Sequence, residues 1–168
     1  KAGTIRRGHK GPPITAVQTE YSLFERSPET NDVLKTVREL GIGFVSYSPL
    51  GRGFLTGQIT TPDNFAPGDF RNTFPRMEKE NFAKNMELVE RIKTIADSKG
   101  VTSGQIALAW TMAQGTVPIP GTRRIKYLEE NVAAADVTLS KDDLAALDKA
   151  APIGVAAGDR YQPQGMAS

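Results

Sequence analysis

A basic turn near residue 120 has the residue types that bind anions. Gly121 lets the backbone approach a ligand closely, the Thr122 hydroxyl follows it, and Arg123, Arg124 and Lys126 add positive charge before an expected helix. The free N–H groups and the positive dipole end of a helix N-terminus attract phosphates. The same residues could instead form an ordinary helix cap with solvated basic side chains. Because cations at a helix N-terminus cost free energy, the arginines favour an anion ligand.

Two residues at predicted strand ends could bind a flat, polar ring. Tyr47 ends a β-branched run beside the turn Gly51-Arg52-Gly53, so its ring could stack on a ligand or pack on a neighbouring strand. Gln18 is polar at the end of an otherwise apolar strand, and it could hydrogen-bond a carboxamide or be a buried glutamine satisfied by the backbone. Residue type and spacing leave both interpretations open at each position.

The composition excludes several kinds of site and partner. The 168 residues include no cysteine and one histidine, His9, so we expect no metal site, no thiolate site and no histidine-containing triad. No G-x-G-x-x-G, P-loop or G-x-S-x-G motif occurs. A formal charge of +2, with no basic run longer than an arginine pair, indicates no nucleic-acid partner. No apolar stretch approaches the roughly 18 residues of a membrane span, so we expect a cytoplasmic protein with no membrane partner.

Short β-branched runs alternate with helical patterns, which predicts an α/β fold. A buried strand is expected over residues 14–19, and further strands over 42–47 and 117–119. Helices are expected from 27 to 41, from about 78–80 to 100, from 102 to about 113, from after Arg124 to about 134, and from 140 onward. A capping box is expected at Thr102 with Gln105, and residues 140–143 are expected to cap the last helix.

The chain is expected to form one unit over residues 1–168, because no linker divides it. Residues 51–76 are a long loop rich in Gly, Pro and Asn, and residues 152–168 a loose tail. The length is sufficient for a sizeable core but well short of the roughly 250 residues of a closed eight-stranded barrel.

Several linked motifs resemble the aldo-keto reductase family. They are AVQTEYSL at 16–23, GIGFVSYSPLGRG at 41–53, VPIPGT at 117–122 and EEN at 129–131, in the family's order and spacing. The segment from Gln105 to Trp110 is similar to the family's penultimate helix, and the match covers about residues 3 to 150. The resemblance implies the C-terminal half of a (β/α)8 TIM-type barrel, about strands six to eight. It also implies an enzyme that uses NADPH, less often NADH, to reduce aldehydes and ketones.

The same resemblance implies which residues bind NADPH. Gln18 would hold the nicotinamide carboxamide, and Tyr47 would stack on the nicotinamide ring. The pyrophosphate would lie under the 51–76 loop, which in the family folds over the cofactor. The residues implied beside the pyrophosphate are Ser48, Pro49, Leu50, Gly51 and Gly53. Those implied beside the adenosine are Gly121, Thr122 and Arg123 at the 2′-phosphate, and Glu130 and Asn131 at the adenine.

The sequence departs from the family at its catalytic residues. The family's Asp, Tyr, Lys and His lie on its second to fourth strands, and this chain resembles the part after the fifth. His9 does not match the catalytic histidine, and Tyr47 matches the stacking tyrosine rather than the proton donor. We therefore expect no catalytic residue here: the parent protein would reduce a small carbonyl substrate, and the 168-residue chain alone would be inactive.

Two alternatives remain open at the level of sequence. The chain could be a non-catalytic nucleotide-binding or interaction module derived from the same fold. Three strands also leave exposed edges, so its expected partner is the missing N-terminal half of the barrel or a second copy of itself.

Overall fold

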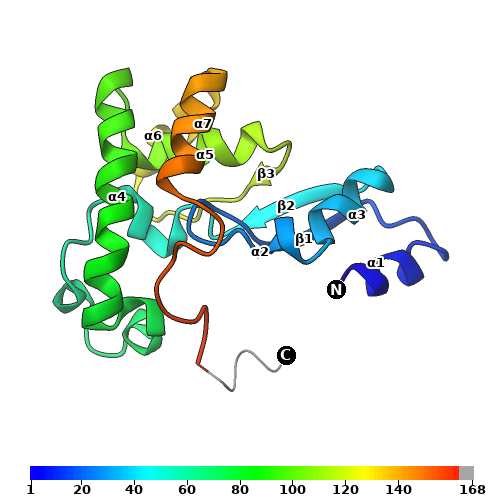
Figure 1. Ribbon diagram of the computed structural model, residues 1–168, viewed down its shortest axis with the longest axis horizontal. Coiled ribbons are helices and arrows are strands. Elements are labelled where there is room, and N and C mark those ends of the chain that lie inside the picture. The colour runs from blue at the N-terminus through cyan, green and yellow to red at the C-terminus, as the bar shows by residue number, and fades with distance from the viewer. Residues whose placement is uncertain (163–168) are drawn as a thin grey trace.

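Three parallel strands form the centre of the molecule, shown in Figure 1 as a computed structural model that describes residues 1–162. They are β1 (Ala16–Glu20), β2 (Gly43–Tyr47) and β3 (Val117–Pro118), in the order β1-β2-β3. Glu20 pairs with Tyr47, so the two longer strands end at the same level. Parallel strands connected through helices confirm the predicted α/β fold, and their carboxyl ends place residues from distant parts of the sequence together.

Helices connect the strands and cover part of the sheet. Helix α1 (Ala2–Gly8) precedes β1, and α2 (Ser27–Thr30) and α3 (Val33–Glu39) lie between β1 and β2. Helices α4 (Lys79–Lys99) and α5 (Ser103–Ala113) lie between β2 and β3, and α6 (Ile125–Ala133) and α7 (Lys141–Ala150) follow β3. Figure 1 shows α4 to α7 grouped at one end of the molecule, while β1, β2 and α1 to α3 extend toward the other.

The local helix signals act as predicted at α5 and α7. The Thr102 side chain accepts a hydrogen bond from the Gln105 amide, and the Gln105 side chain accepts one from the Thr102 amide. Ser140 and Asp143 form the same reciprocal pair at α7. Each box satisfies N–H groups that the first helical turn leaves without partners. The predicted capping box of α5 is confirmed, and the cap predicted for α7 is confirmed in the form of a second box.

The single helix predicted over 27–41 is instead two helices. Asp32, between α2 and α3, has a left-handed φ of 63°, a conformation that interrupts an α-helix and that a short polar residue tolerates. At the start of α2, the Ser27 amide donates a hydrogen bond to the Glu25 carboxylate at 3.1 Å.

The core lies where α4, α5 and α7 meet the chain that leaves β1. Its fully buried side chains include Tyr21, Ile92, Trp110 and Leu147. The prediction of a fully buried first strand is wrong, because β1 alternates between exposed and partly buried positions and Gln18 is exposed. The reason is that one face of the β1–β2 pair packs on helices, while the other is uncovered in this chain.

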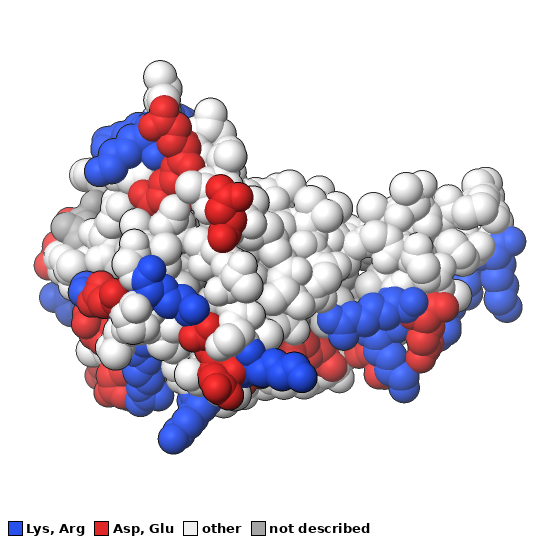
Figure 2. All heavy atoms as spheres, turned by 90° about the horizontal axis from the view of Figure 1, so that it is seen from above, with Lys and Arg blue, Asp and Glu red and all other residues white. Residues whose placement is uncertain are grey.

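Three further observations bear on what the chain could contact. Exposed apolar side chains lie on β3, α6 and the turn between them: Val117, Ile119, Ile125, Leu128 and Val132, each at least 45% exposed. Figure 2 shows positive and negative side chains intermingled on the face it presents. Among the described residues, no helix combines the length and apolarity needed to cross a bilayer.

The expectation of a loose tail from Pro152 onward is wrong for residues 152–162. Val155, Ala156 and Tyr161 pack against the core, and Arg160 reaches Glu20 at the end of β1. A composition rich in Gly, Pro and Ala gave no sign of these contacts, because several of them are made by the main chain of residues 157 and 158. The remainder of the predicted tail, residues 163–168, lies outside the described residues.

Candidate functional site

A pocket of about 820 Å³ opens at the carboxyl ends of β2 and β3. Its walls are the turn after β2, the 51–76 loop, the turn after β3 and the start of α6. In parallel α/β structures this edge is where ligands bind, because the loops there are free to vary while the strands hold them in place. The pocket is therefore the candidate functional site.

Most of the residues expected to bind a cofactor line this one pocket. They are Tyr47, Ser48, Pro49, Leu50, Gly53, Gly121, Thr122, Arg123, Glu130 and Asn131. Gly51 is not in the lining; it is buried in the turn, with φ 56°, and an added Cβ would lie 3.2 Å from Leu55 and 3.3 Å from Phe24. Gln18 is also outside the lining. It projects from the same sheet face as Tyr47, because it lies two residues before Glu20, the partner of Tyr47.

The turn after β2 has an unusual backbone that faces the pocket. Ser48 and Arg52 have φ values of 50° and 58°, and Gly53 has 92°. For residues other than glycine, a left-handed φ costs about 1–2 kcal/mol, so the surrounding contacts must hold this turn in place. Backbone strain of this kind gathers at ligand sites, which makes the turn a candidate for contact with a ligand.

The start of α6 forms the basic side of the pocket. The Thr122 hydroxyl accepts a hydrogen bond from the Arg124 amide at 3.2 Å and so shapes the turn into the helix. Within residues 1–162, neither Arg123 nor Arg124 forms a salt bridge, and both are exposed. Two uncompensated arginines beside a helix N-terminus attract an anion, which is the arrangement the sequence predicted here.

Two contacts connect α6 to the other walls of the pocket. Tyr127 donates a hydrogen bond from its hydroxyl to the Gln58 side chain at 2.7 Å, which joins α6 to the 51–76 loop. The Glu130 carboxylate accepts a hydrogen bond from the Thr102 hydroxyl at 2.8 Å, and its carbonyl accepts one from Gln105 at 3.2 Å. Glu130 therefore already has partners on α5, at the edge of the pocket.

Tyr47 marks the aromatic side of the pocket. Its hydroxyl accepts a hydrogen bond from Arg160 and lies 3.3 Å from the Tyr161 hydroxyl. Burial and the hydrogen bond that the Tyr47 hydroxyl makes to Tyr161 raise the pKa of Tyr47 to about 12, so the phenol is neutral near pH 7. A neutral ring beside a strained turn is suited to stacking on a planar group.

The structure adds residues that the sequence analysis did not assign. Arg52 lines the pocket, and its guanidinium lies 4.2 Å from the Phe74 ring and 3.1 Å from the Glu20 carboxylate. Arg71 also lines the pocket, and it donates to the Arg52 carbonyl at 3.2 Å. The charge of Arg52 within the Gly-Arg-Gly turn was a usable signal. Arg71 had none, because its loop shows no periodicity.

The 51–76 loop is held by an internal ion pair. Arg71 contacts the Asp69 carboxylate at 2.7 Å, and its guanidinium lies 4.5 Å from the Phe65 ring. The Arg71 hydrogen bonds hold the pKa of Asp69 below its usual range, so the pair stays ionised near pH 7. This pair places a cation of the loop against the turn after β2.

The open parallel sheet, the strand-end pocket and the basic start of α6 are the features of an α/β protein with a candidate ligand site at the carboxyl edge of its sheet. A model of the aldo/keto reductase family matches residues 1–152, and the chain belongs to that family. Its three parallel strands and their helices are a fragment of the family's (β/α)8 barrel.

Similar proteins agree with this assignment. Over 168 residues the chain is 46% identical to aldo-keto reductase str7 of Strobilurus tenacellus, covering 98% of this chain and 50% of the relative. It is 49% identical over 166 residues to aldo-keto reductase yakc of Schizosaccharomyces pombe, whose name carries NADP(+), covering 96% and 49%. The fold matches a glycerol dehydrogenase from Gluconobacter oxydans with a TM-score of 0.80 at 22% identity, covering 92% of this chain and 47% of the other. The chain thus spans about half the length of its relatives.

Proposed function

We propose that this chain is the cofactor-binding half of an NADPH-dependent oxidoreductase that reduces aldehydes or ketones to alcohols. The observation that carries the proposal is that one pocket, of about 820 Å³, contains both Tyr47 at the end of β2 and the basic start of α6 after β3. That combination fits a ligand with a planar ring at one end and phosphates at the other. The name of the relative yakc, which carries NADP(+), agrees with it.

Each wall of the pocket fits one part of NADPH. Tyr47 would stack on the nicotinamide ring, and Gln18, on the same sheet face, would bind its carboxamide. The turn from Ser48 to Gly53 would approach the pyrophosphate through its main chain, with Arg52 adding charge. Thr122 and Arg123 would bind the adenosine 2′-phosphate, and Glu130 and Asn131 would lie at the adenine.

The chain would hold the cofactor without completing the reaction. NADPH supplies a hydride when bound, and reduction of a carbonyl also needs a donor that protonates the developing alkoxide. By the resemblance described above, the family's Asp, Tyr, Lys and His have no counterpart in this sequence. We therefore propose that the parent protein turns over a small carbonyl substrate and that the chain alone does not.

Binding of the two nicotinamide cofactors tests the proposal directly. NADPH fluorescence titration of the 168-residue chain should give a dissociation constant about 10- to 100-fold lower than that of NADH, because charge-assisted hydrogen bonds to the 2′-phosphate are worth about 1.5–3 kcal/mol. Arg123→Met should remove most of this difference. Arg91→Met is the matched control, since Arg91 is an exposed arginine of α4 that is not among the residues lining the pocket. Equal affinity for both cofactors would refute the assignment of the basic turn.

Turnover is the second readout. The purified chain with NADPH and an aldehyde should consume the cofactor no faster than buffer alone. Sustained consumption above that background would show that a proton donor is present and would contradict the proposed division of roles.

A second candidate role, contact with another barrel segment, is supported by the exposed apolar side chains of β3 and α6. Ile125, Leu128 and Val132 lie on α6, which buries none of its side chains. We propose that the N-terminal half of the barrel covers this surface in the parent protein and that the free chain associates with itself there. Light scattering should then give a mass above 18.2 kDa that falls to the monomer value in Leu128→Glu. A monomer in both would count against this role.

A further inference from the structure

A short C-terminal segment crosses the end of the sheet beside the pocket. After α7 the chain turns back along α4 and reaches the carboxyl ends of β1 and β2, as Figure 1 shows in orange and red. Residues 157–161 of this segment, here called the strap, contact α4, the 73–77 turns and Glu20. None of these contacts was expected from the sequence.

The strap is held at its start by main-chain contacts. Asn85 on α4 is 2% exposed and holds Ala157 from both sides, donating to its carbonyl at 3.0 Å and accepting from its amide at 2.7 Å. Arg76 donates to the Gly158 carbonyl at 3.3 Å. Gly158 has φ 86°, and a Cβ there would lie 2.9 Å from the main chain of Pro75, so the backbone needs glycine at this approach.

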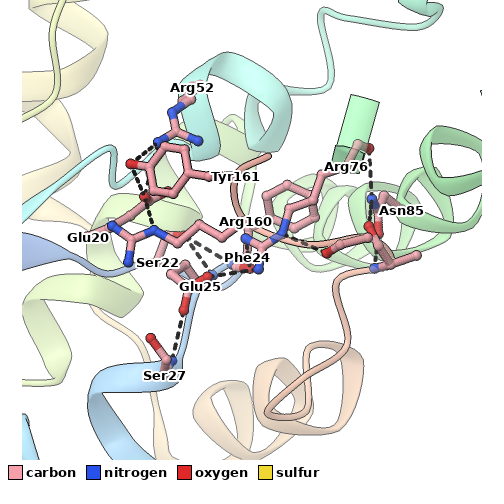
Figure 3. A network of polar contacts seen from close by, with 12 residues as sticks. Glu20, Ser22, Phe24, Glu25, Ser27, Arg52, Arg76, Asn85, Arg160 and Tyr161 are labelled. Carbon is pink, nitrogen blue, oxygen red and sulfur yellow. Dashed lines mark hydrogen bonds and ion pairs between the residues drawn. The ribbon is translucent and has the colours of Figure 1, made fainter. Parts of the chain in front are cut away.

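This anchoring places Arg160 and Tyr161 around Glu20, as Figure 3 shows. Glu20 is 3% exposed and accepts a hydrogen bond from Arg160 Nε at 2.7 Å and from Arg52 at 3.1 Å. Arg52 also donates to the Tyr161 hydroxyl at 2.7 Å. A buried carboxylate shared by two guanidinium groups fixes all three side chains, because losing either partner leaves charge poorly solvated.

The same two strap residues hold the hydroxyl end of Tyr47. Arg160 donates to it, and the Tyr161 hydroxyl lies 3.3 Å away. The Arg160 guanidinium carbon lies 6.0 Å from the centre of the Tyr47 ring. The ring therefore has one orientation before any ligand arrives, and its other side remains part of the pocket lining.

We propose that the strap positions Tyr47 for stacking, with Arg160 and Tyr161 as positioning residues that act through its hydroxyl. The inference rests on the proposed function, in which the stacked group is the nicotinamide ring. Ordering a mobile side chain on binding costs about 0.5–1.5 kcal/mol, and a ring that is already ordered avoids that cost. Arg52 belongs to both the strap contacts and the pocket wall, so it joins ring orientation to the turn after β2.

The test compares two ligands that differ by the ring. NADPH carries the nicotinamide, and 2′-phosphoadenosine 5′-diphosphoribose lacks it. Arg160→Met and Tyr161→Phe should each weaken NADPH binding by about 3- to 10-fold more than they weaken binding of the ring-free ligand, which reports any effect transmitted through Arg52 to the phosphates. In a Tyr47→Phe background, Arg160→Met should weaken NADPH binding no further, because the hydroxyl through which it acts is gone.

The outcomes separate this inference from the proposed function. Equal weakening of both ligands, or no weakening of either, would overturn the positioning role while leaving NADPH binding intact. If the unmodified chain bound neither ligand, both proposals would fall. Tyr161→Phe keeps the ring packed 5.8 Å from the Phe74 ring, so it retains the fold if Arg160→Met does not, and thermal melting checks each variant.

Discussion

Replacing Asn85 by alanine should release the strap from α4 and destabilise the whole chain. The Asn85 amide donates to the carbonyls of Arg76 at 3.1 Å and Ala157 at 3.0 Å, and its oxygen accepts from the Ala157 amide at 2.7 Å. The side chain is 2% exposed, so water cannot readily replace these partners. Alanine leaves three main-chain groups without hydrogen bonds.

The size of the effect follows from this count. At about 1 kcal/mol for each hydrogen bond, the free energy of unfolding should fall by about 3 kcal/mol. For a chain of 168 residues this corresponds to a melting temperature lower by about 6–12 °C. Asn81→Ala is the matched control, one helical turn earlier on α4: it removes a single hydrogen bond, to the Pro75 carbonyl at 2.8 Å, and should cost about 1 kcal/mol.

Urea unfolding followed by circular dichroism measures the loss of global stability, and trypsin digestion measures how often the strap opens locally. Cleavage after Arg160 should be faster in Asn85→Ala than in Asn81→Ala, because the strap opens more often. An Asn85→Ala variant as stable as Asn81→Ala, with unchanged cleavage after Arg160, would show that these hydrogen bonds do not hold the strap.

Further predictions concern the α7 cap and the titration of two side chains. Ser140→Ala should cost about 1 kcal/mol and lower the melting temperature by about 2–4 °C, as scanning calorimetry would show, because the Asp143 amide loses its cap. Hydrogen bonds from Lys99 and Ser140 lower the pKa of Asp143 from 3.8 to about 2. The contribution of ionised Asp143 to stability is therefore present above pH 3.8 and lost as the pH falls through about 2. Asp143→Asn should make the melting temperature fall less steeply with pH over this acid range. The pKa of Tyr47 is raised from 10.0 to about 12, so its contribution is present below pH 10.0 and lost as the pH rises through about 12. Tyrosinate absorbance should show Tyr161→Phe lowering the pKa of Tyr47; an unchanged titration would place the cause in burial alone.

Much of the candidate site could be predicted because its residues lie directly after strands. Tyr47 follows from the end of β2, and Thr122 and Arg123 follow from the end of β3, so recognising two strands was enough to place them at one edge. The resemblance to the aldo-keto reductases added Glu130 and Asn131, which α6 brings to the same pocket. Whether these residues bind NADPH stays a prediction, as does the expected cytoplasmic location.

The features that the sequence did not predict correctly all depend on contacts between distant segments of the chain. Gln18 was expected on a buried strand, but burial depends on what covers each face of β1, and this chain covers one. Arg160 and Tyr161 lie in a stretch whose composition is typical of a loose tail. Their partners Glu20 and Tyr47 are more than a hundred residues away, so no local pattern could reveal the network.

The sequence by itself determined what short-range chemistry controls. Hydroxyl and carboxylate caps start α5 and α7, glycine ends α4 with a φ of 67°, and β-branched runs form the parallel strands. Only the tertiary structure decided which faces are covered and where the strap lies. A hydrogen bond such as that between Glu20 and Arg160 forms because packing of α4 against residues 157 and 158 brings the two side chains together, and no property of either segment alone specifies that meeting.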